Sequence, residues 1–261
     1  MRNRGPFFVE IRLIASDSDS GQAYNALYEE ASLSQIESFY LWLMDQLYLP
    51  NSGRLLDVSC GSGEVVRLAA QRGLAATGID ISIVAAHAAH RNVQPANGTI
   101  GVSAGERLPF PDQCFDFVTN IGSLEHFVDP AQGVREMARV LKPDGRAFVL
   151  LPNTFSLLTN VWIAFRQGLT SADPIQPIQR YGARADWVCL LESNGLIVRR
   201  TIKYERVWPR RAGDWGYYVR RPKEMLHLLA TPFVPLNLAW CFLFTCERSN
   251  RGSLAEPGAK A

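Results

Sequence analysis

The chain has few of the residues that mark specialised protein classes. Its five cysteines are spread between positions 60 and 246 without a C-x-x-C pair, which argues against a disulfide framework and a zinc site. No metal is therefore expected, and a reducing cytoplasm fits best. Net charge is only +2 over 261 residues, so the overall excess typical of nucleic-acid-binding chains is missing. Repeats are absent, and 47% hydrophobic with 20% charged residues is typical of a globular domain.

Long hydrophobic runs are also scarce. The one candidate, residues 228–245, has 18 residues without a charge, which only reaches the length needed for a membrane-spanning helix. Pro232, Pro235 and Asn237 interrupt it. Its second half, from Leu238, is instead predicted to be a buried strand.

Strand-like and helix-like segments alternate through most of the chain. Strands are predicted at 55–59, 74–80, 99–103, 115–120 and 146–152. Helices are predicted at 22–49 (one or two helices), 63–73, 82–92 and 131–141. This alternation is typical of a doubly wound, Rossmann-like α/β fold with a mostly parallel sheet.

One domain is expected over residues 22–247, between a flexible arm and a disordered tail. Its parts are N-terminal helices at 22–50, a cofactor-binding core at 51–153, a helical cap insertion at 154–182, and a last helix and strands with a basic aromatic loop at 183–247. The arm is 1–21 and the tail is 248–261.

The segment 55–73 carries the strongest functional signal. Asp57 ends a strand, and Gly61 and Gly63 then permit a tight turn into a helix whose N-terminus can receive an anion. Asp80 ends the next strand, where a carboxylate can accept both hydroxyls of a ribose. A dinucleotide site needs a third glycine where Val66 stands, so that kind of site is disfavoured.

These residues resemble the first motif and ribose acid of the class I S-adenosylmethionine-dependent methyltransferases. The segments 104–118, 120–130 and 135–153 are similar to the next three motifs, in order. The most similar branch is the small-molecule one typified by ubiquinone and menaquinone biosynthesis (methyltransferase type 11). The resemblance implies a seven-stranded sheet with an antiparallel last strand. It also implies S-adenosylmethionine as cofactor and methyl transfer to oxygen or carbon of a small-molecule or lipid-linked acceptor.

The resemblance implies most of the cofactor-binding residues as well. Two positions depart from the family pattern: Ser59 stands where glycine is usual, and Ala104 where an acid is usual. Glu106 or the backbone is therefore expected to hold the adenine amino group. Tyr28, on the N-terminal helix, is expected either to close over the methionine end of the cofactor or to pack in the core. The implied cofactor-binding residues are Asp57, Ser59, Gly61, Gly63, Asp80, Ile81, Gly105, Glu106, Asn120 and Ser123.

On the acceptor side, His126 follows the fourth strand and is the candidate general base, with a structural role as the alternative. Four aromatic residues are candidates for the substrate pocket. Phe155 and Trp162 lie at helical spacing in the insertion, where packing of a cap helix is the favoured alternative. Trp208 and Trp215 belong to the basic aromatic loop.

Residues 199–223 contain nine basic and two acidic residues, interleaved with tryptophan and tyrosine. This pattern fits an anionic membrane surface or a lipid-like acceptor, with a solvated loop as the alternative. A cytoplasmic protein with peripheral contact at the inner membrane surface is therefore predicted. The alternative functions are an RNA methyltransferase and a non-catalytic cofactor-binding regulator. Nucleic acid is disfavoured because no Asp/Asn-Pro-Pro-aromatic segment follows the fourth strand.

Overall fold

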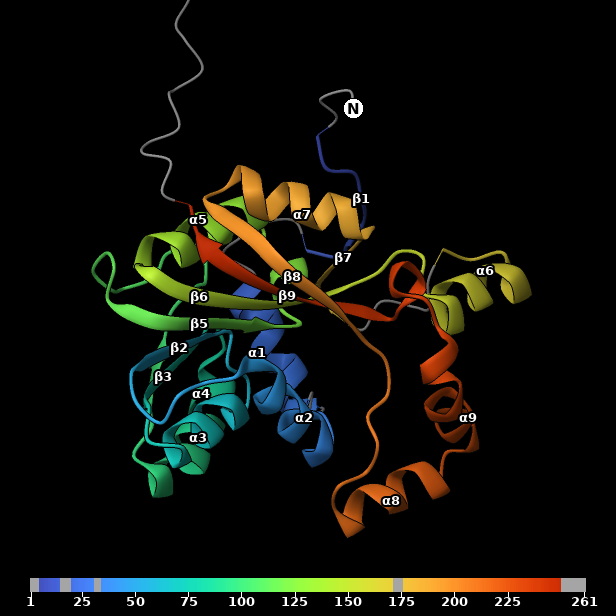
Figure 1. Ribbon diagram of the computed structural model, residues 1–261, viewed down its shortest axis with the longest axis horizontal. Helices are drawn as coiled ribbons and strands as arrows, with labels where there is room; N and C mark the ends of the chain where they lie inside the picture. The colour runs from blue at the N-terminus through green and yellow to red at the C-terminus, as the bar shows by residue number, and fades with distance from the viewer. Residues whose placement is uncertain (1–4, 15–19, 31–33, 171–175, 250–261) are drawn as a thin grey trace, which may run out of the picture.

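A computed structural model describes residues 5–14, 20–30, 34–170 and 176–249. Its main sheet consists of β2 (Arg54–Val58), β3 (Ala75–Asp80), β4 (Thr99–Val102), β5 (Phe115–Ile121), β6 (Leu141–Pro152), β8 (Leu196–Tyr204) and β9 (Cys241–Arg248). The strand order is β4-β3-β2-β5-β6-β9-β8 (Figure 1). The strands from β4 to β6 are parallel, whereas β9 runs antiparallel to both of its neighbours. The predicted Rossmann-like α/β fold with an antiparallel last strand is confirmed.

Helices cover both faces of this sheet (Figure 1). One face carries α1 (Ser20–Glu30), α2 (Glu37–Leu47), α3 (Glu64–Gln71) and α4 (Ile83–Val93), and the other carries α5 (Pro130–Val140) and α7 (Arg184–Ser193). Each face has its own buried core, with Leu43 and Val66 in one and Met137 and Trp187 in the other. Because both faces are covered, the central strands are rich in apolar residues, and these apolar runs made the strands predictable from the sequence.

Residues 8–12 differ from the arm that the sequence predicted. They form β1 (Phe8–Arg12), which pairs antiparallel with β7 (Ile178–Gly182) in a small second sheet. The Phe8 ring packs 4.5 Å from the Trp187 ring, measured between centroids. The partner strand lies about 170 residues away in sequence, so no local signal announces the pairing. The arm residues 1–4 and 15–19 lie outside the described residues.

The predicted basic aromatic loop is helical instead. It contains α8 (Ala212–Val219) and the start of α9 (Pro222–Ala230). The buried Asp214 anchors α8 to α2, because it accepts hydrogen bonds from the Ser38 N–H at 2.8 Å and from the Ser38 hydroxyl. Three arginines of the segment form ion pairs within the fold: Arg206 with Glu224, Arg210 with Asp45 and Arg211 with Glu37. The local positive charge is thus partly neutralised.

The cap insertion and the uncharged run complete the chain. The insertion begins with the π-helical turn η4 (Leu157–Val161) and continues as α6 (Trp162–Gln167), which confirms a helical insertion after β6. The uncharged run divides into the end of α9, the 3₁₀ turns η5 (Thr231–Phe233) and η6 (Leu236–Leu238), and β9. No helix among the described residues is long and apolar enough to cross a membrane. Most of the predicted tail, residues 250–261, lies outside the described residues.

Candidate active site

The loop between β2 and α3 makes a sharp turn through backbone conformations that suit glycine. Ser59 and Gly61 both have left-handed backbones, with φ of 61° and 51°. A Cβ added to Gly61 would lie 3.0 Å from the hydroxyl oxygen of Tyr28 on α1. Because Gly61 has no side chain, the Tyr28 hydroxyl has room to lie against the loop. Glycine is usual at position 59 because it adopts a left-handed backbone without strain. In this chain Ser59 adopts the same left-handed backbone although it has a side chain.

Asp80 ends β3 and is held by the loops on either side of it. Its Oδ2 accepts a hydrogen bond from the Gly61 N–H at 2.9 Å, and its Oδ1 accepts one from the Ser82 N–H at 2.9 Å. Ser82 then caps α4 by accepting a bond from the Ala85 N–H. Each carboxylate oxygen keeps a second lone pair, so Asp80 is fixed in place and can still accept bonds from the hydroxyls of a ligand.

A cavity of about 1200 Å³ lies at the carboxyl ends of β2, β3 and β5, where ligands bind in open α/β sheets. It brings together residues that are far apart in sequence. Ten of the predicted site residues line it: Tyr28, Asp57, Ser59, Gly61, Asp80, Ile81, Gly105, Glu106, Ser123 and His126.

Two predicted cofactor residues, Gly63 and Asn120, support the site from behind and do not line the cavity. Gly63 begins α3 with φ of 78°, and an added Cβ would lie 2.9 Å from a Val93 methyl carbon on α4. It therefore permits close packing of the two helices. The buried Asn120 amide donates to the Val58 carbonyl at 3.2 Å and accepts from the Leu124 N–H at 2.8 Å. Asn120 thereby fixes the turn that precedes His126.

The four aromatic candidates for the substrate pocket require correction. Phe155, Trp162, Trp208 and Trp215 are 45–56% exposed, and none of them lines the cavity. The helical stripe in the insertion turns outward from the domain. The two tryptophans near α8 likewise lie on the outer surface.

Among the charged side chains of the cavity wall, acids predominate. Asp57 is buried and accepts a hydrogen bond from the Thr119 hydroxyl at 2.7 Å. Burial raises the pKa of Asp57 to about 7. The hydrogen bond from Thr119 opposes this rise, and the nearby negative charge of Asp80 adds a smaller increase. Burial also raises the pKa of Asp80, although backbone N–H groups oppose the shift. A positively charged ligand would relieve both carboxylates, so the wall is suited to a cation.

The chain is similar to methyltransferases of known sequence. Residues 56–149 match the protein family described as methyltransferase domain. The chain is 38% identical over 112 residues to the ubiquinone/menaquinone biosynthesis C-methyltransferase of Geotalea uraniireducens, across 40% of this chain and 48% of that protein. It is 36% identical over 124 residues to the 27-O-demethylrifamycin SV methyltransferase of Amycolatopsis mediterranei, across 44% and 46%. Residues 56–149 therefore belong to a class I S-adenosylmethionine-dependent methyltransferase domain. The chain spans about half the length of these curated relatives.

Solved structures share the fold of this methyltransferase domain over more of the chain. The putative methyltransferase of Haloferax volcanii, solved in complex with the Trm112 methyltransferase activator, has a TM-score of 0.62 at 16% identity, over 91% of this chain and 100% of that one. The geranyl diphosphate C-methyltransferase of Streptomyces coelicolor has a TM-score of 0.58 at 17% identity, over 81% and 78%. At these identities the likeness shows the fold alone.

The cavity fits S-adenosylmethionine, the cofactor of this methyltransferase class. Asp80 offers carboxylate oxygens at the position where a ribose is bound in such folds. The buried acids Asp57 and Asp80 suit the positive amine and sulfonium of the cofactor. Glu106, which also lines the cavity, is already held in place because its Oε1 accepts from the Val128 N–H at 3.0 Å.

His126 lies in the cavity wall of the methyltransferase domain beside Glu125. Its Nδ1–H donates to the Ile178 carbonyl at 2.5 Å, which leaves the Nε2 lone pair 3.7 Å from the Glu125 Oε1. Burial lowers the pKa of His126 to about 4 and raises the pKa of Glu125 to about 8. Near pH 7 both side chains are therefore neutral, and their contact is not an ion pair.

Sequence reasoning missed the aromatic end of the cavity. Phe39 and Tyr40 from α2, Tyr204 from the end of β8 and Trp240 line it together. The Tyr204 ring stacks on the Trp240 ring with centroids 5.4 Å apart, and its centroid lies 5.0 Å from that of Phe39. These residues come from three distant segments, so only the folded topology brings them together.

The small sheet of β1 and β7 holds the loop that carries His126, and sequence reasoning also missed this role. The buried Arg180 guanidinium donates to the backbone carbonyls of Glu125 at 3.3 Å, Val128 at 3.2 Å and the intervening Phe127. The same guanidinium forms an ion pair with Glu10 on β1 at 2.5 Å. The position of this part of the cavity wall therefore depends on both strands of the small sheet.

Proposed function

We propose that the protein is an enzyme that transfers a methyl group from S-adenosylmethionine to oxygen or carbon of a small-molecule or lipid-linked acceptor. The observation that carries this proposal is the continuity of the cavity. One end is acidic and holds Asp57 and Asp80, and the other end is aromatic and holds Tyr204 and Trp240. The cavity thus offers adjoining sites to a cationic methyl donor and an apolar acceptor.

The cofactor supplies an electrophilic methyl group on a sulfonium, so the protein needs mainly to align the reacting groups and exclude water. Asp80 and the Gly61 loop are proposed to hold the ribose, and Tyr28 to cover the loop. No covalent intermediate with the enzyme is required. Proton removal is needed only when the acceptor carries a proton of high pKa.

We keep His126 as the candidate base for such acceptors. Its Nε2 lone pair is available because Nδ1–H is bound to a backbone carbonyl. Its lowered pKa of about 4 makes it a weak base, which limits the rate gain that it can provide. The rate gain from His126 is therefore expected to be modest and to shrink as the hydroxyl or enol of the acceptor becomes more acidic.

The aromatic wall favours a flat, conjugated acceptor. Stacked rings offer apolar surface and preferred offset geometries to another ring. The names of two similar proteins agree with this class, since one acts in ubiquinone and menaquinone biosynthesis and another on a demethylrifamycin. We propose that the reaction takes place in the cytoplasm, since the five cysteines are free and widely separated.

Labelled turnover tests the proposal. The protein is incubated with S-adenosylmethionine carrying a radioactive methyl group and with cell extract, and products are separated into lipid, small-molecule and RNA pools. Label in the lipid or small-molecule pool, absent with Asp80→Ala, is expected. Label in RNA would support the RNA methyltransferase alternative. Cofactor binding by calorimetry without label in any pool would support the regulatory alternative.

A further inference from the structure

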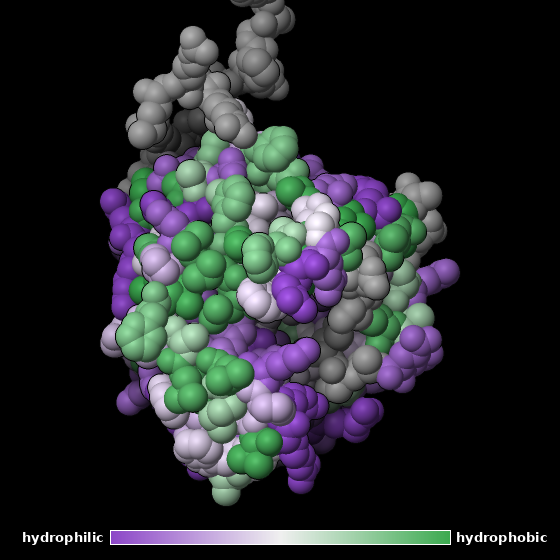
Figure 2. Space-filling model, turned by 90° about the vertical axis from the view of Figure 1, so that its right-hand side faces the viewer, coloured by the Kyte–Doolittle hydropathy of each residue, from purple (hydrophilic) through white to green (hydrophobic). Residues whose placement is uncertain are grey.

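Large apolar side chains gather on one outer surface of the molecule. Figure 2 shows this side, where α6, α9 and η5 lie together at the right of Figure 1. We call this surface the apolar platform and define it by six residues. They are Trp162, Phe165 and Leu169 from the α6 segment, and Leu226, Leu229 and Phe233 from the α9–η5 segment.

Individual side chains of the platform are highly exposed to solvent. Phe233 is 85% exposed, Phe165 is 78% exposed and Leu226 is 67% exposed. Scattered exposed leucines are ordinary, whereas an apolar group of this size on one face marks an interaction site. Leu228 and Val234, from the same segments, are buried against the domain. Both belong to the α9–η5 segment, which is therefore held firmly, so its outward apolar residues are not a sign of loose packing.

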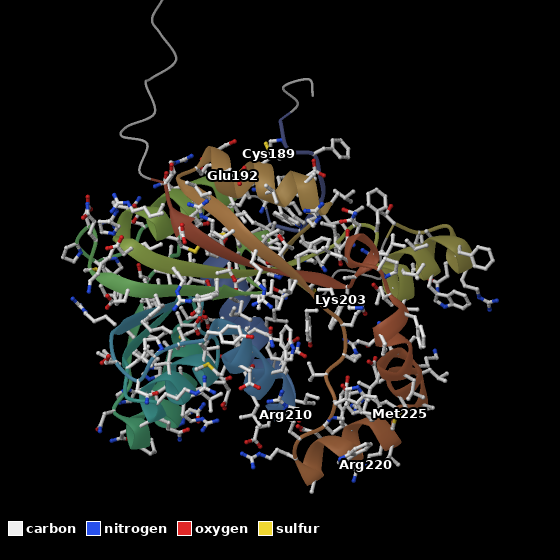
Figure 3. The ribbon with its side chains drawn as sticks, in the orientation of Figure 1. Cys189, Glu192, Lys203, Arg210, Arg220 and Met225 are labelled. Atoms are coloured by element: carbon white, nitrogen blue, oxygen red, sulfur yellow. The ribbon has the colours of Figure 1, made fainter. Side chains whose placement is uncertain are left out.

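The charges around the platform are of one sign. Among the described residues, no carboxylate lies within ion-pair distance of Arg166, Arg220, Arg221 or Lys223. Figure 3 shows Arg220 on the outer side of α8. The helices α6, α8 and α9 contain two acids, Asp214 and Glu224, and both are engaged with partners inside the fold. Arg166 and Arg221 lie over the rings of Trp162 and Tyr217, which leaves their charge without a carboxylate partner. Positive charge of this kind, on the helices that carry or adjoin the exposed apolar residues, complements an anionic lipid surface.

The α9–η5 part of the platform is fixed to the wall of the cavity. Lys203, at the end of β8, donates to the backbone carbonyls of Thr231 at 2.9 Å and Val234 at 2.7 Å, and so holds η5 (Figure 3). His227 of α9 contacts the buried Glu205 at 2.8 Å. Glu205 also accepts from the Trp240 N–H at 2.7 Å, and Trp240 lines the aromatic end of the cavity.

We infer that the apolar platform docks the protein onto an anionic lipid bilayer. Phe165 and Phe233 enter the boundary between headgroups and acyl chains, while the unpaired basic residues contact the headgroups. Docking in this orientation brings the aromatic end of the cavity close to the bilayer. A lipid-linked acceptor would then have a short path to the cavity; this last step rests on the proposed function, whereas the docking itself does not.

Sedimentation with vesicles tests the inference without any methyl acceptor. The full chain is mixed with sucrose-loaded vesicles of equal parts phosphatidylglycerol and phosphatidylcholine, or of phosphatidylcholine alone, at low and high salt. The wild type is expected to sediment with the anionic vesicles, and high salt should weaken this binding. Each basic residue at the surface strengthens binding about fivefold, so Arg220→Gln with Lys223→Gln should weaken it about 30-fold.

The apolar contribution is tested by Phe165→Ser with Phe233→Ser, which should weaken vesicle binding at least tenfold. The matched control is Ile83→Ser with Val102→Ser, which removes two exposed apolar residues from α4 and β4, on the other side of the molecule from α6 and α9 (Figure 1), and should leave binding unchanged. Wild-type protein that stays in the supernatant with both vesicles would overturn the inference, as would an equal loss in the control. Sedimentation velocity showing a dimer that Phe165→Ser with Phe233→Ser dissociates would assign the face to a second copy and also overturn it.

Discussion

Asp80 is the residue at which the cofactor site can be tested most directly. Replacing Asp80 by Ala removes the acceptor proposed for the ribose hydroxyls and the acceptor of the Gly61 and Ser82 N–H groups. A hydrogen bond to a charged group contributes about 1.5–3 kcal/mol, and two such bonds do not add fully. We therefore expect cofactor binding to weaken by about 2–3 kcal/mol, which is about 30- to 150-fold in Kd.

The variant also perturbs the fold, so the two effects must be separated. Losing the Ser82 N–H bond disturbs the start of α4, where Ser82 is the N-cap. Ser82→Ala is a matched control, because it removes that cap at a cost of about 1 kcal/mol but keeps the Asp80 carboxylate. Ser82→Ala should lower the midpoint of urea denaturation and leave the Kd within about threefold of wild type, given the tens-fold effect expected for the lost ribose acceptor.

Calorimetric titration with S-adenosylmethionine and S-adenosylhomocysteine measures the effect, with circular dichroism to verify folding. Both ligands carry the ribose, so both should lose affinity by the same factor. A folded Asp80→Ala protein with wild-type Kd would refute the assigned site. Equal losses in Asp80→Ala and Ser82→Ala would show that the loop, and not the carboxylate, determines binding.

Three further variants test neighbouring parts of the site. Ser59→Gly should raise the free energy of unfolding in urea by about 0.5–1 kcal/mol, because glycine adopts a left-handed φ without strain; unchanged or lower stability would contradict this. Asp57 titrates at about 7 and a cation favours its ionised form, so cofactor affinity should rise between pH 6 and 8. Asp57→Asn should flatten that slope in calorimetry, and an equal slope in both proteins would exclude Asp57 as its source. His126→Gln should keep cofactor affinity and lower turnover up to about 100-fold, less for acidic acceptors; an equal loss for every acceptor would indicate a structural role.

The core of the fold was predictable because its signals are local. The strand ending at Asp57, the turn at Gly61 and the strand ending at Asp80 each follow from a few adjacent residues. In a parallel sheet such strand ends meet at one edge, so their meeting in the cavity also followed from the sequence. The strain at Ser59 was visible only as a departure from a family pattern, and the structure supplies its backbone cause.

The parts that sequence reasoning missed depend on contacts between distant segments. Residues 206–225 are rich in arginine and tryptophan, which resembles a solvated loop, yet Asp214 binds the start of α2 and holds α8 in place. The aromatic end of the cavity likewise requires α2 to lie beside the ends of β8 and β9. Trp208 and Trp215 were expected to line a pocket because of their residue type, whereas their exposure is decided by the packing of α8 and of the segment before it.

The pairing of β1 with β7 suggests that the N-terminal strand controls the reacting side of the cavity. Arg180 is 3% exposed and holds the loop of Glu125 and His126, while Glu10 on β1 balances its charge. Glu10→Gln should lower the free energy of unfolding by about 1–2 kcal/mol, between the values for exposed and buried ion pairs, because Glu10 is partly exposed. Turnover should fall while cofactor Kd holds, since Asp80 is held by the Gly61 and Ser82 N–H groups and not by this sheet. Arg12→Gln, which removes the other partner of Glu10, is the control and should change neither. Full turnover in folded Glu10→Gln, or loss of cofactor binding together with turnover, would refute this control by β1.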